Sequence, residues 1–343
     1  MAELGWKADV FSIARVPLPL VTAARVAAAC GLPLFAGVLT GQAMAGVIAA
    51  ATALLTTLAD IGESRRARSG TMAVAVVALL LGGAIGGRYG VTTFADEVLI
   101  FVAAVLAGWV SAAHPGISTV ARFFAMAVAI GAGLHLSDPS MAWAALAGGA
   151  CAIAVAFITW RFDGVPVSEN LFDWRTGIRR ALLGFGAGPL FAVCYGLAAV
   201  LALMLAHHFG VERPYWAAVT VLMVMRREGL LNLKLVIQYM TGTLGGILAA
   251  GAVTPLLNPL WALALVATTC AASARIGIAL NPALGFAGIT TFFMLAFDIA
   301  LRGTGMAAHI LSTRLLDVGV GCLIALAWTL IARAIERAKT LQP

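Results

Sequence analysis

The sequence predicts an all-α polytopic membrane protein with about twelve transmembrane helices, arranged as two parallel six-helix repeats. Three observations carry this prediction: the composition, the length of the apolar runs, and short motifs that recur in the two halves. Of the 343 residues, 62% are hydrophobic and only 11% are charged, and the mean hydropathy is +1.00. A soluble domain carries about 25% charged residues, so lipid is the solvent that suits most of this chain.

The apolar runs have the length that a bilayer requires, since a helix needs about 20 residues to cross the hydrocarbon. Lipid offers the backbone no hydrogen bonds, so we expect each run to be helical. The first run is long enough to span, and we interpret it as a transmembrane helix rather than a cleaved signal peptide. The predicted spans are 18–37, 42–59, 70–87, 97–113, 117–136, 140–160, 180–208, 214–225, 236–253, 258–280, 284–301 and 306–332.

A polar segment divides the chain into two halves that resemble each other. The predicted organisation is a first repeat over 1–160, a cytoplasmic polar linker over 161–179 and a second repeat over 180–343. Two dipeptides recur roughly 170 residues apart, Gly70-Thr71 as Gly242-Thr243 and Phe123-Phe124 as Phe292-Phe293. Between them in each half, the break at His114-Pro115 is echoed by Asn281-Pro282. Because six is an even number, both copies start from the same side of the membrane, which makes the repeat parallel.

The basic residues predict the orientation. With both termini in the cytoplasm, only four of the 22 Lys and Arg residues fall on the outer side, namely Arg88, Arg213, Arg302 and Arg314. Positive charge collects on the cytoplasmic side of membrane proteins, so we expect a multi-pass protein of the bacterial inner membrane. The same bias explains the net charge of +7 without a nucleic-acid partner.

Other classes of function lack their motifs. The five cysteines lie in apolar segments without metal-ligand spacing, so we expect no metal site and read them as buried apolar residues. There is no phosphate-binding loop of the kind that ATP-driven pumps use. No catalytic triad, zinc motif or carboxylate pair is evident, and we therefore expect neither an enzyme nor a cofactor.

The eighth predicted span opens on a distinctive motif. It begins Arg213-Pro214-Tyr215-Trp216 and continues to Thr220, and after a short basic loop the ninth span contains Thr241-Gly242-Thr243-Leu244-Gly245-Gly246. This pattern resembles the fusaric acid resistance (FUSC) family. The first half is similar to the family's companion segment, with Asp60 ending the second span and Arg65-Arg66 in the following loop.

The resemblance implies six-helix units present twice, and export of aromatic carboxylic acids or similar organic anions. We expect a secondary transporter driven by the proton gradient. The alternative is a passive organic-anion channel, because the plant aluminium-activated malate transporters are distant relatives. The expected partners are a small organic anion and membrane lipid. A monomer and a homodimer both remain open, as does a membrane-fusion partner protein.

Three arginines lie one to two turns inside their predicted spans, all on the cytoplasmic side: Arg25, Arg122 and Arg275. An ionised side chain at the middle of the bilayer costs about 2.5–3.5 kcal/mol on insertion scales. The position of each arginine therefore needs an explanation. Guanidinium groups facing a cavity would bind carboxylates, and we predict that these three line an anion path. The alternative is that each side chain reaches back to the lipid headgroups.

The twelfth span places His309, Thr313 and Asp317 on one helix face, with Arg314 three residues before the aspartate. Burial favours the protonated carboxyl and a nearby guanidinium favours the carboxylate. We therefore predict that Asp317, with His309, carries a coupling proton and that Arg314 contacts the substrate. A static Arg314–Asp317 ion pair that joins two helices is the alternative.

The eighth span is short, which is typical of transporter helices that end at a substrate site. We predict that Tyr215 and Trp216 stack on an aromatic acid and that Thr220 belongs to the same site. An ordinary belt of interfacial aromatic residues is the alternative. Asp298 and Arg302, four residues apart, are expected to form a structural ion pair.

Overall fold

A computed structural model describes residues 10–61, 64–88, 94–111, 115–134, 138–163, 179, 188–225, 229–302 and 307–340. Within these residues the protein has twelve α-helices and two short 3₁₀ turns, η1 (Trp160–Phe162) and η2 (Thr254–Leu256). The helices are α2 (Leu20–Leu39), α3 (Ala43–Leu58), α4 (Arg65–Gly86), α5 (Phe94–Val110), α6 (Pro115–Leu134), α7 (Pro139–Thr159), α9 (Gly188–His208), α10 (Tyr215–Val224), α11 (Gly229–Val253), α12 (Leu260–Leu280), α13 (Pro282–Leu301) and α14 (Ala307–Thr340).

The twelve helices confirm the all-helical prediction, and each overlaps one predicted span. Eight are long and apolar enough to cross a membrane, whereas α3, α10 and the segment Leu316–Trp328 of α14 are apolar but shorter. The chain is therefore a multi-pass membrane protein with eight candidate spans. Among the differences from the predicted bounds, α11 begins seven residues early and α14 extends eight residues further. Most of the predicted linker lies outside the described residues.

Local sequence explains where several helices begin. Asn281 precedes α13, and its side-chain oxygen accepts a hydrogen bond from the backbone N–H of Ala283. Asp138 caps α7 in the same way, and in both helices a proline occupies the first turn. Proline suits that position because its missing N–H would have no helical partner there.

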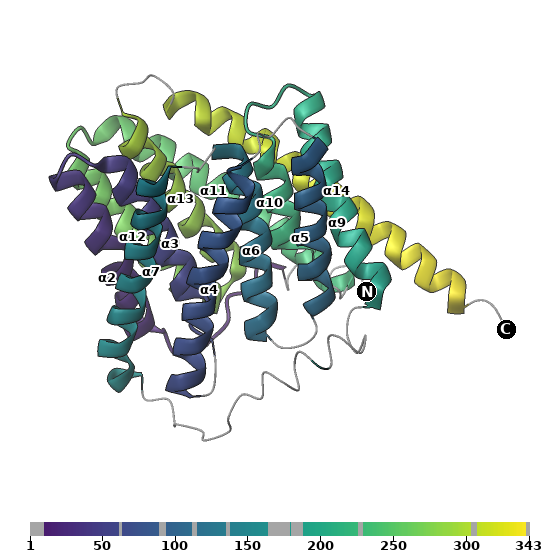
Figure 1. Ribbon diagram of the computed structural model, residues 1–343, viewed down its shortest axis with the longest axis horizontal. Coiled ribbons are helices and arrows are strands. Elements are labelled where there is room, and N and C mark those ends of the chain that lie inside the picture. The colour runs from purple at the N-terminus through teal and green to yellow at the C-terminus, as the bar shows by residue number, and fades with distance from the viewer. Residues whose placement is uncertain are drawn as a thin grey trace.

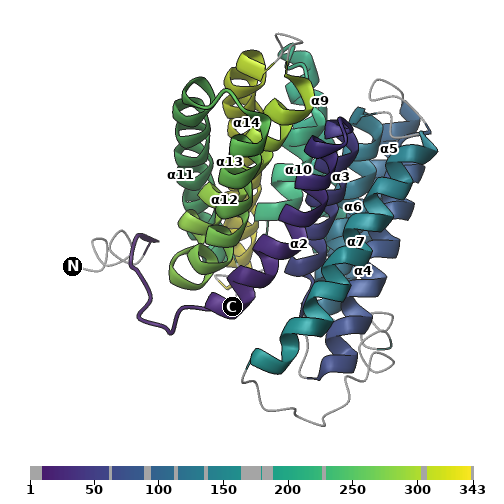
Figure 2. The same cartoon turned by 90° about the vertical axis from the view of Figure 1, so that its left-hand side faces the viewer.

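The helices stand side by side in a bundle (Figure 1). In Figure 2, α11–α14 lie on one side of the molecule, α4–α7 on the other, and α2, α3, α9 and α10 between them. In the first half, α2 packs on α3 and α7, α3 on α7, α4 on α6 and α7, and α5 on α6. In the second half, α9 packs on α10 and α14, α10 on α14, α11 on α13 and α14, and α12 on α13. The halves meet where α5 contacts α9, α2 contacts α12, α6 contacts α10 and α3 contacts α13.

Small residues allow the closest helix contacts. A Cβ atom at Gly148 of α7 would collide with the carbonyl of Ala49 in α3. In the second half, a Cβ atom at Gly321 of α14 would press on the carbonyl of Ala217 in α10, at 2.6 Å. Glycine at these positions lets two backbones approach, which is how helices associate in lipid, where apolar surface gives no driving force.

The shortest helix is also the most enclosed. Every residue of α10 except Met223 is buried, and the helix contacts α6, α9, α11 and α14. A helix that is apolar on all sides belongs in the interior of a bundle. Its first residues, Tyr215 and Trp216, are therefore placed among other helices instead of facing lipid.

The chain before α2 is docked on the second half. Val10 is 2% exposed, and its carbonyl accepts hydrogen bonds from Gln238 Nε2 at 2.9 Å and Asn281 Nδ2 at 3.0 Å. Asn281 Nδ2 also donates to the Ser12 carbonyl at 2.9 Å, and the Ala14 N–H donates to a carbonyl at the end of α12. Two buried amide side chains thus hold this segment by its backbone.

Candidate functional site

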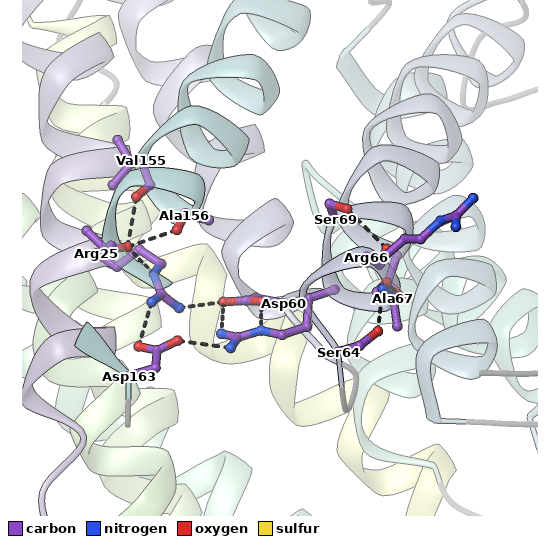
Figure 3. A network of polar contacts seen from close by, with 12 residues as sticks. Arg25, Asp60, Ser64, Arg66, Ala67, Ser69, Val155, Ala156 and Asp163 are labelled. Carbon is purple, nitrogen blue, oxygen red and sulfur yellow. Dashed lines mark hydrogen bonds and ion pairs between the residues drawn. The ribbon is translucent and has the colours of Figure 1, made fainter. Parts of the chain in front are cut away.

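The first cluster of buried charge surrounds Arg25 (Figure 3). Its guanidinium donates to Asp60 Oδ2 at 2.6 Å, to Asp163 Oδ1 at 2.6 Å and to Thr159 Oγ1 at 2.6 Å. Asp60 follows α3, Asp163 follows η1, and Thr159 is the last residue of α7. All three partners therefore meet Arg25 at the end of the bundle where α2 begins.

Arg68, in the first turn of α4, completes this cluster. Its Nε and Nη2 atoms donate to Asp60 at 2.6 and 2.7 Å, and its Nη1 atom lies 2.9 Å from Asp163. Two arginines and two aspartates thus balance their charges. Burial by itself raises the pKa of Asp60, but the hydrogen bonds and charges of Arg68 and Arg25 outweigh it and hold that pKa below its ordinary value.

Arg275 of α12 approaches the same cluster from the second half. It is half-buried, and Asp60, Arg25, Arg68 and Asp163 are the charged groups that act on it. The structure thus brings two of the predicted anion-path arginines, Arg25 and Arg275, to one place. Their positions differ, because the Arg25 guanidinium already has acceptors in Asp60, Asp163 and Thr159. Arg275 adds a positive charge that the balanced cluster does not offset.

The second cluster lies where α10 and α14 begin, at the opposite end of the bundle (Figure 1). The guanidinium carbon of Arg314 sits 3.8 Å from the centre of the Trp216 ring. Arg314 is only 6% exposed, and its Nε and Nη1 atoms have no hydrogen-bond partner. Burying a cation whose N–H donors lack partners costs free energy. A bound anion would supply the missing acceptors.

Other polar groups around Arg314 are also unsatisfied. Asp317 is 1% exposed and its Oδ1 atom has no hydrogen-bond partner, and the same holds for the hydroxyl of Tyr215, which is 2% exposed. Arg213, just before α10, lies within electrostatic range of both groups. The cluster therefore combines two guanidinium groups, one carboxyl and one phenol in a largely apolar setting.

Aromatic rings enclose this cluster. Trp216 meets Phe293 and Phe297 of α13 edge-on, at 6.3 Å between ring centres in both cases. Arg213 lies 5.7 Å from the centre of the Phe297 ring. Thr220, one turn along α10, donates to the Trp216 carbonyl at 2.9 Å and lies next to Tyr239 of α11. The predicted group of Arg314, Tyr215, Trp216 and Thr220 is thus assembled around the buried start of α10.

Two ion pairs that helical spacing suggested are absent among the described residues. Arg314 and Asp317 are not within ion-pair distance, since the guanidinium stacks on Trp216 instead. Arg302 does not pair with Asp298 but donates to the carbonyls of Asn258 and Leu257. The predicted Asp298–Arg302 pair was therefore wrong, and the alternative of a static Arg314–Asp317 pair is not formed. Spacing along a helix permits a contact, while the side-chain rotamer and the neighbouring helices decide it.

Arg122 is separate from both clusters. Its Nη2 atom is 3.4 Å from Ser118 one turn earlier on α6, and its charge acts on the hydroxyl of Tyr195 in α9. That hydroxyl donates to the Leu222 carbonyl near the end of α10. Arg122 thus lies beside the end of α10, while Arg314 lies beside its start.

The backbone of His309 is part of α14, but its side chain lies outside the described residues. Sequence reasoning missed Arg68, Asp163 and Arg213 as members of the two clusters. The sequence does mark these three residues, because each is a charged residue at the edge of an apolar helix. It does not indicate which side chains each of them would contact. In the described residues no group of three His, Cys, Asp or Glu side chains is placed to hold a metal ion.

Comparison with known proteins found one family model that matches the part of the chain around the second cluster. Residues 200–328 match the family model described as fusaric acid resistance protein-like, and this stretch includes Trp216, Arg314 and Asp317. No curated protein and no solved structure matches the chain. The match confirms the resemblance carried by the Tyr215-Trp216 and Gly242-Thr243 motifs. The chain therefore contains a fusaric acid resistance protein-like domain over residues 200–328.

Proposed function

We propose that this membrane protein is a secondary transporter that exports organic anions, with aromatic carboxylic acids as the expected class and the proton gradient as the driving force. The observation that carries the proposal is Arg314, a buried guanidinium whose Nε and Nη1 atoms have no partner. A carboxylate supplies the acceptors that such a group lacks, and it would bind strongly where water is excluded.

The surroundings of Arg314 suit an organic anion better than a cation. Arg213 and Arg314 outnumber the single carboxyl of Asp317, so the cluster attracts negative charge. Tyr215 offers a buried hydroxyl beside Arg213, and Phe297 supplies apolar surface. The proposed substrate-binding residues therefore lie together in one cluster, which consists of Arg314, Tyr215, Trp216 and Thr220.

Asp317 is the proposed proton carrier, with His309 on the same face of α14. Its carboxyl is buried and lacks a hydrogen-bond partner at Oδ1. Carboxyl groups inside a membrane protein commonly serve proton transfer, because their ionisation responds strongly to neighbouring charge. Arg314 and Arg213 supply that charge here.

At the other end of the bundle, Arg275 is the proposed point where cytoplasmic anions first meet the protein, beside Arg25. The balanced pairs of Arg25 and Arg68 with Asp60 and Asp163 leave Arg275 as the surplus cation. Arg122, beside the buried end of α10, would be an intermediate contact along the same path.

We further propose that the transporter consists of two six-helix repeats, 1–160 and 180–343, joined by the cytoplasmic linker 161–179. The helix contacts support this, since nearly every packed pair in the first half has a counterpart seven labels later in the second. The glycine contacts support it as well, since α7 meets α3 at Gly148 and α14 meets α10 at Gly321.

A bacterial inner-membrane location with both termini in the cytoplasm is proposed from the distribution of Lys and Arg.

Purified protein in liposomes tests this function with labelled benzoate as the probe. Export driven by protons predicts uphill benzoate movement when a pH gradient is imposed. Arg314→Gln should reduce the rate of this movement by about tenfold or more. Arg88→Gln is the matched control, because Arg88 is exposed. A large voltage-driven benzoate current without uphill movement would identify a passive channel, and no flux of benzoate or other acids would refute the proposal. A growth-inhibition screen of a deletion strain against aromatic and aliphatic acids would then identify the substrate.

A further inference from the structure

We propose that Trp216 is a positioning residue, which holds the guanidinium of Arg314 so that its N–H groups face the transported anion, and that the substrate's own ring does not stack on this indole. The inference rests on the proposed function and deepens it. It assigns to one aromatic side chain the task of keeping a buried cation in place without cancelling its charge.

The guanidinium carbon of Arg314 lies close over the Trp216 ring. At 3.8 Å from the ring centre, Arg314 makes the closest of the cation–π contacts in the described part of the chain; the others measure 4.8 to 5.7 Å. A guanidinium that stacks on an aromatic ring uses its face, while its N–H groups point outward in its plane. The absence of hydrogen-bond partners at Arg314 Nε and Nη1 agrees with this arrangement.

Trp216 is itself held firmly. Phe293 and Phe297 meet its ring edge-on at interplanar angles of 65° and 86°, and Tyr215 lies 5.4 Å away between ring centres. Trp216 is 6% exposed and sits in the first turn of the enclosed helix α10. A ring so confined offers a fixed surface to Arg314, and it has little free area on which a substrate ring could stack.

Stacking on an aromatic ring differs from ion pairing in one respect that matters for transport. A carboxylate such as Asp317, three residues away, would neutralise Arg314 and compete with an incoming anion for the same donors. An indole attracts the cation through its electron-rich face and leaves the positive charge in place. Since Arg314 and Asp317 do not pair, the guanidinium keeps its N–H donors available for a carboxylate, and little reorganisation is needed when the anion binds.

Equilibrium binding to the purified full-length protein tests this assignment with two acids of similar size, benzoate and cyclohexanecarboxylate. The variants are Trp216→Leu, Trp216→Phe, Arg314→Lys and the double variant Trp216→Leu/Arg314→Lys. Lysine keeps the charge but lacks the planar group that stacks. Trp143, which is 69% exposed on α7, provides the matched control as Trp143→Leu and should bind both acids as wild type does.

Trp216→Leu is expected to weaken binding of both acids by a similar factor of about ten, and Trp216→Phe by about three, because phenylalanine gives a weaker cation–π contact. In the Arg314→Lys background, Trp216→Leu should change the Kd by less than about twofold, since the two side chains then no longer act together. If Trp216→Leu does not purify as a monodisperse protein, Trp216→Phe and Trp216→Phe/Arg314→Lys carry the same comparison.

Three results would overturn the inference. Independent, additive effects of the two substitutions would mean that Trp216 does not act through Arg314. A loss of benzoate binding much larger than the loss of cyclohexanecarboxylate binding would mean that the substrate ring does stack on Trp216. Neither of these two results would contradict the proposed function. If the wild-type protein bound neither acid, both the proposed function and this inference would be refuted.

Discussion

Arg25 of α2 and Asp60, just after α3, form an ion pair at 2.6 Å in which the two side chains are 0% and 1% exposed. A second pair joins Arg25 to Asp163, again at 2.6 Å, although the two residues are 138 positions apart in sequence. Charges so deeply buried are tolerated only when each has its partners. The pairs tie α2, the end of α3 and the end of α7 together at one end of the bundle.

Replacing Arg25 with glutamine is therefore expected to destabilise the protein strongly, by about 3–5 kcal/mol, because two buried carboxylates lose a partner. Thermal unfolding in detergent measures the effect. Arg66→Gln is the control, since Arg66 is exposed on α4 near the same end, and it should leave the unfolding temperature nearly unchanged. Equal effects of the two substitutions would contradict a structural role for the pairs.

The same cluster predicts how stability depends on pH. The pKa of Asp60 lies below its ordinary value in the folded protein, so its contribution is fully present above the unfolded-state pKa of about 4 and is lost as pH falls through the lower folded-state value. The unfolding temperature of wild type should thus drop more steeply below about pH 4 than that of Asp60→Asn. Parallel curves for the two proteins would show that Asp60 does not contribute in this way.

Two glycines of the first half should respond in opposite directions to alanine. A Cβ atom at Gly148 meets the backbone of Ala49, which cannot give way without moving α3 or α7. Gly148→Ala should therefore destabilise by about 1–3 kcal/mol. Gly70→Ala, in α4 with open space around it, should be neutral or stabilising by up to about 1 kcal/mol, because alanine favours helix. Unfolding temperatures test both, and a stabilising Gly148→Ala would rule out the close packing.

The docking of the N-terminal segment predicts a change in chemical reactivity. Gln238→Leu removes one of the two donors to the Val10 carbonyl, so residue 10 should become more accessible. A cysteine introduced as Val10→Cys should react slowly with a maleimide in otherwise wild-type protein and several-fold faster beside Gln238→Leu, as followed by peptide mapping. Phe11→Cys is the control, because Phe11 is 58% exposed and should react quickly in both. Equal rates at residue 10 would mean that Gln238 does not hold the segment.

If Asp317 carries the coupling proton, Asp317→Asn should abolish uphill benzoate transport driven by a pH gradient and retain exchange of labelled for unlabelled benzoate. Asparagine keeps the shape of the side chain but cannot release a proton. Asp298→Asn is the matched control, since Asp298 is also a buried aspartate in the second half, and it should retain coupled transport. Full pH-driven transport by Asp317→Asn would exclude the coupling role.

The sequence by itself determined the class of the protein and the order of its helices. Hydropathy over some 20 residues is a local property, and lipid forces each apolar run into a helix. The ends were less well defined, because charged turns such as residues 333–340 in α14 continue a helix beyond its apolar part. The motif at Tyr215 and Trp216 was likewise local, and the resemblance it carried agrees with the family model that matches residues 200–328.

Only the tertiary structure decided which charged side chains meet. Sequence reasoning treated Arg25, Arg122 and Arg275 alike, yet Arg25 is paired with carboxylates, Arg122 lies near Tyr195, and Arg275 remains the surplus cation. Helical spacing suggested that Arg314 would pair with Asp317, whereas the adjacent helix α10 provides the Trp216 ring on which it stacks. Such choices depend on rotamers and on helices distant in sequence, and a burial pattern along one helix does not contain them.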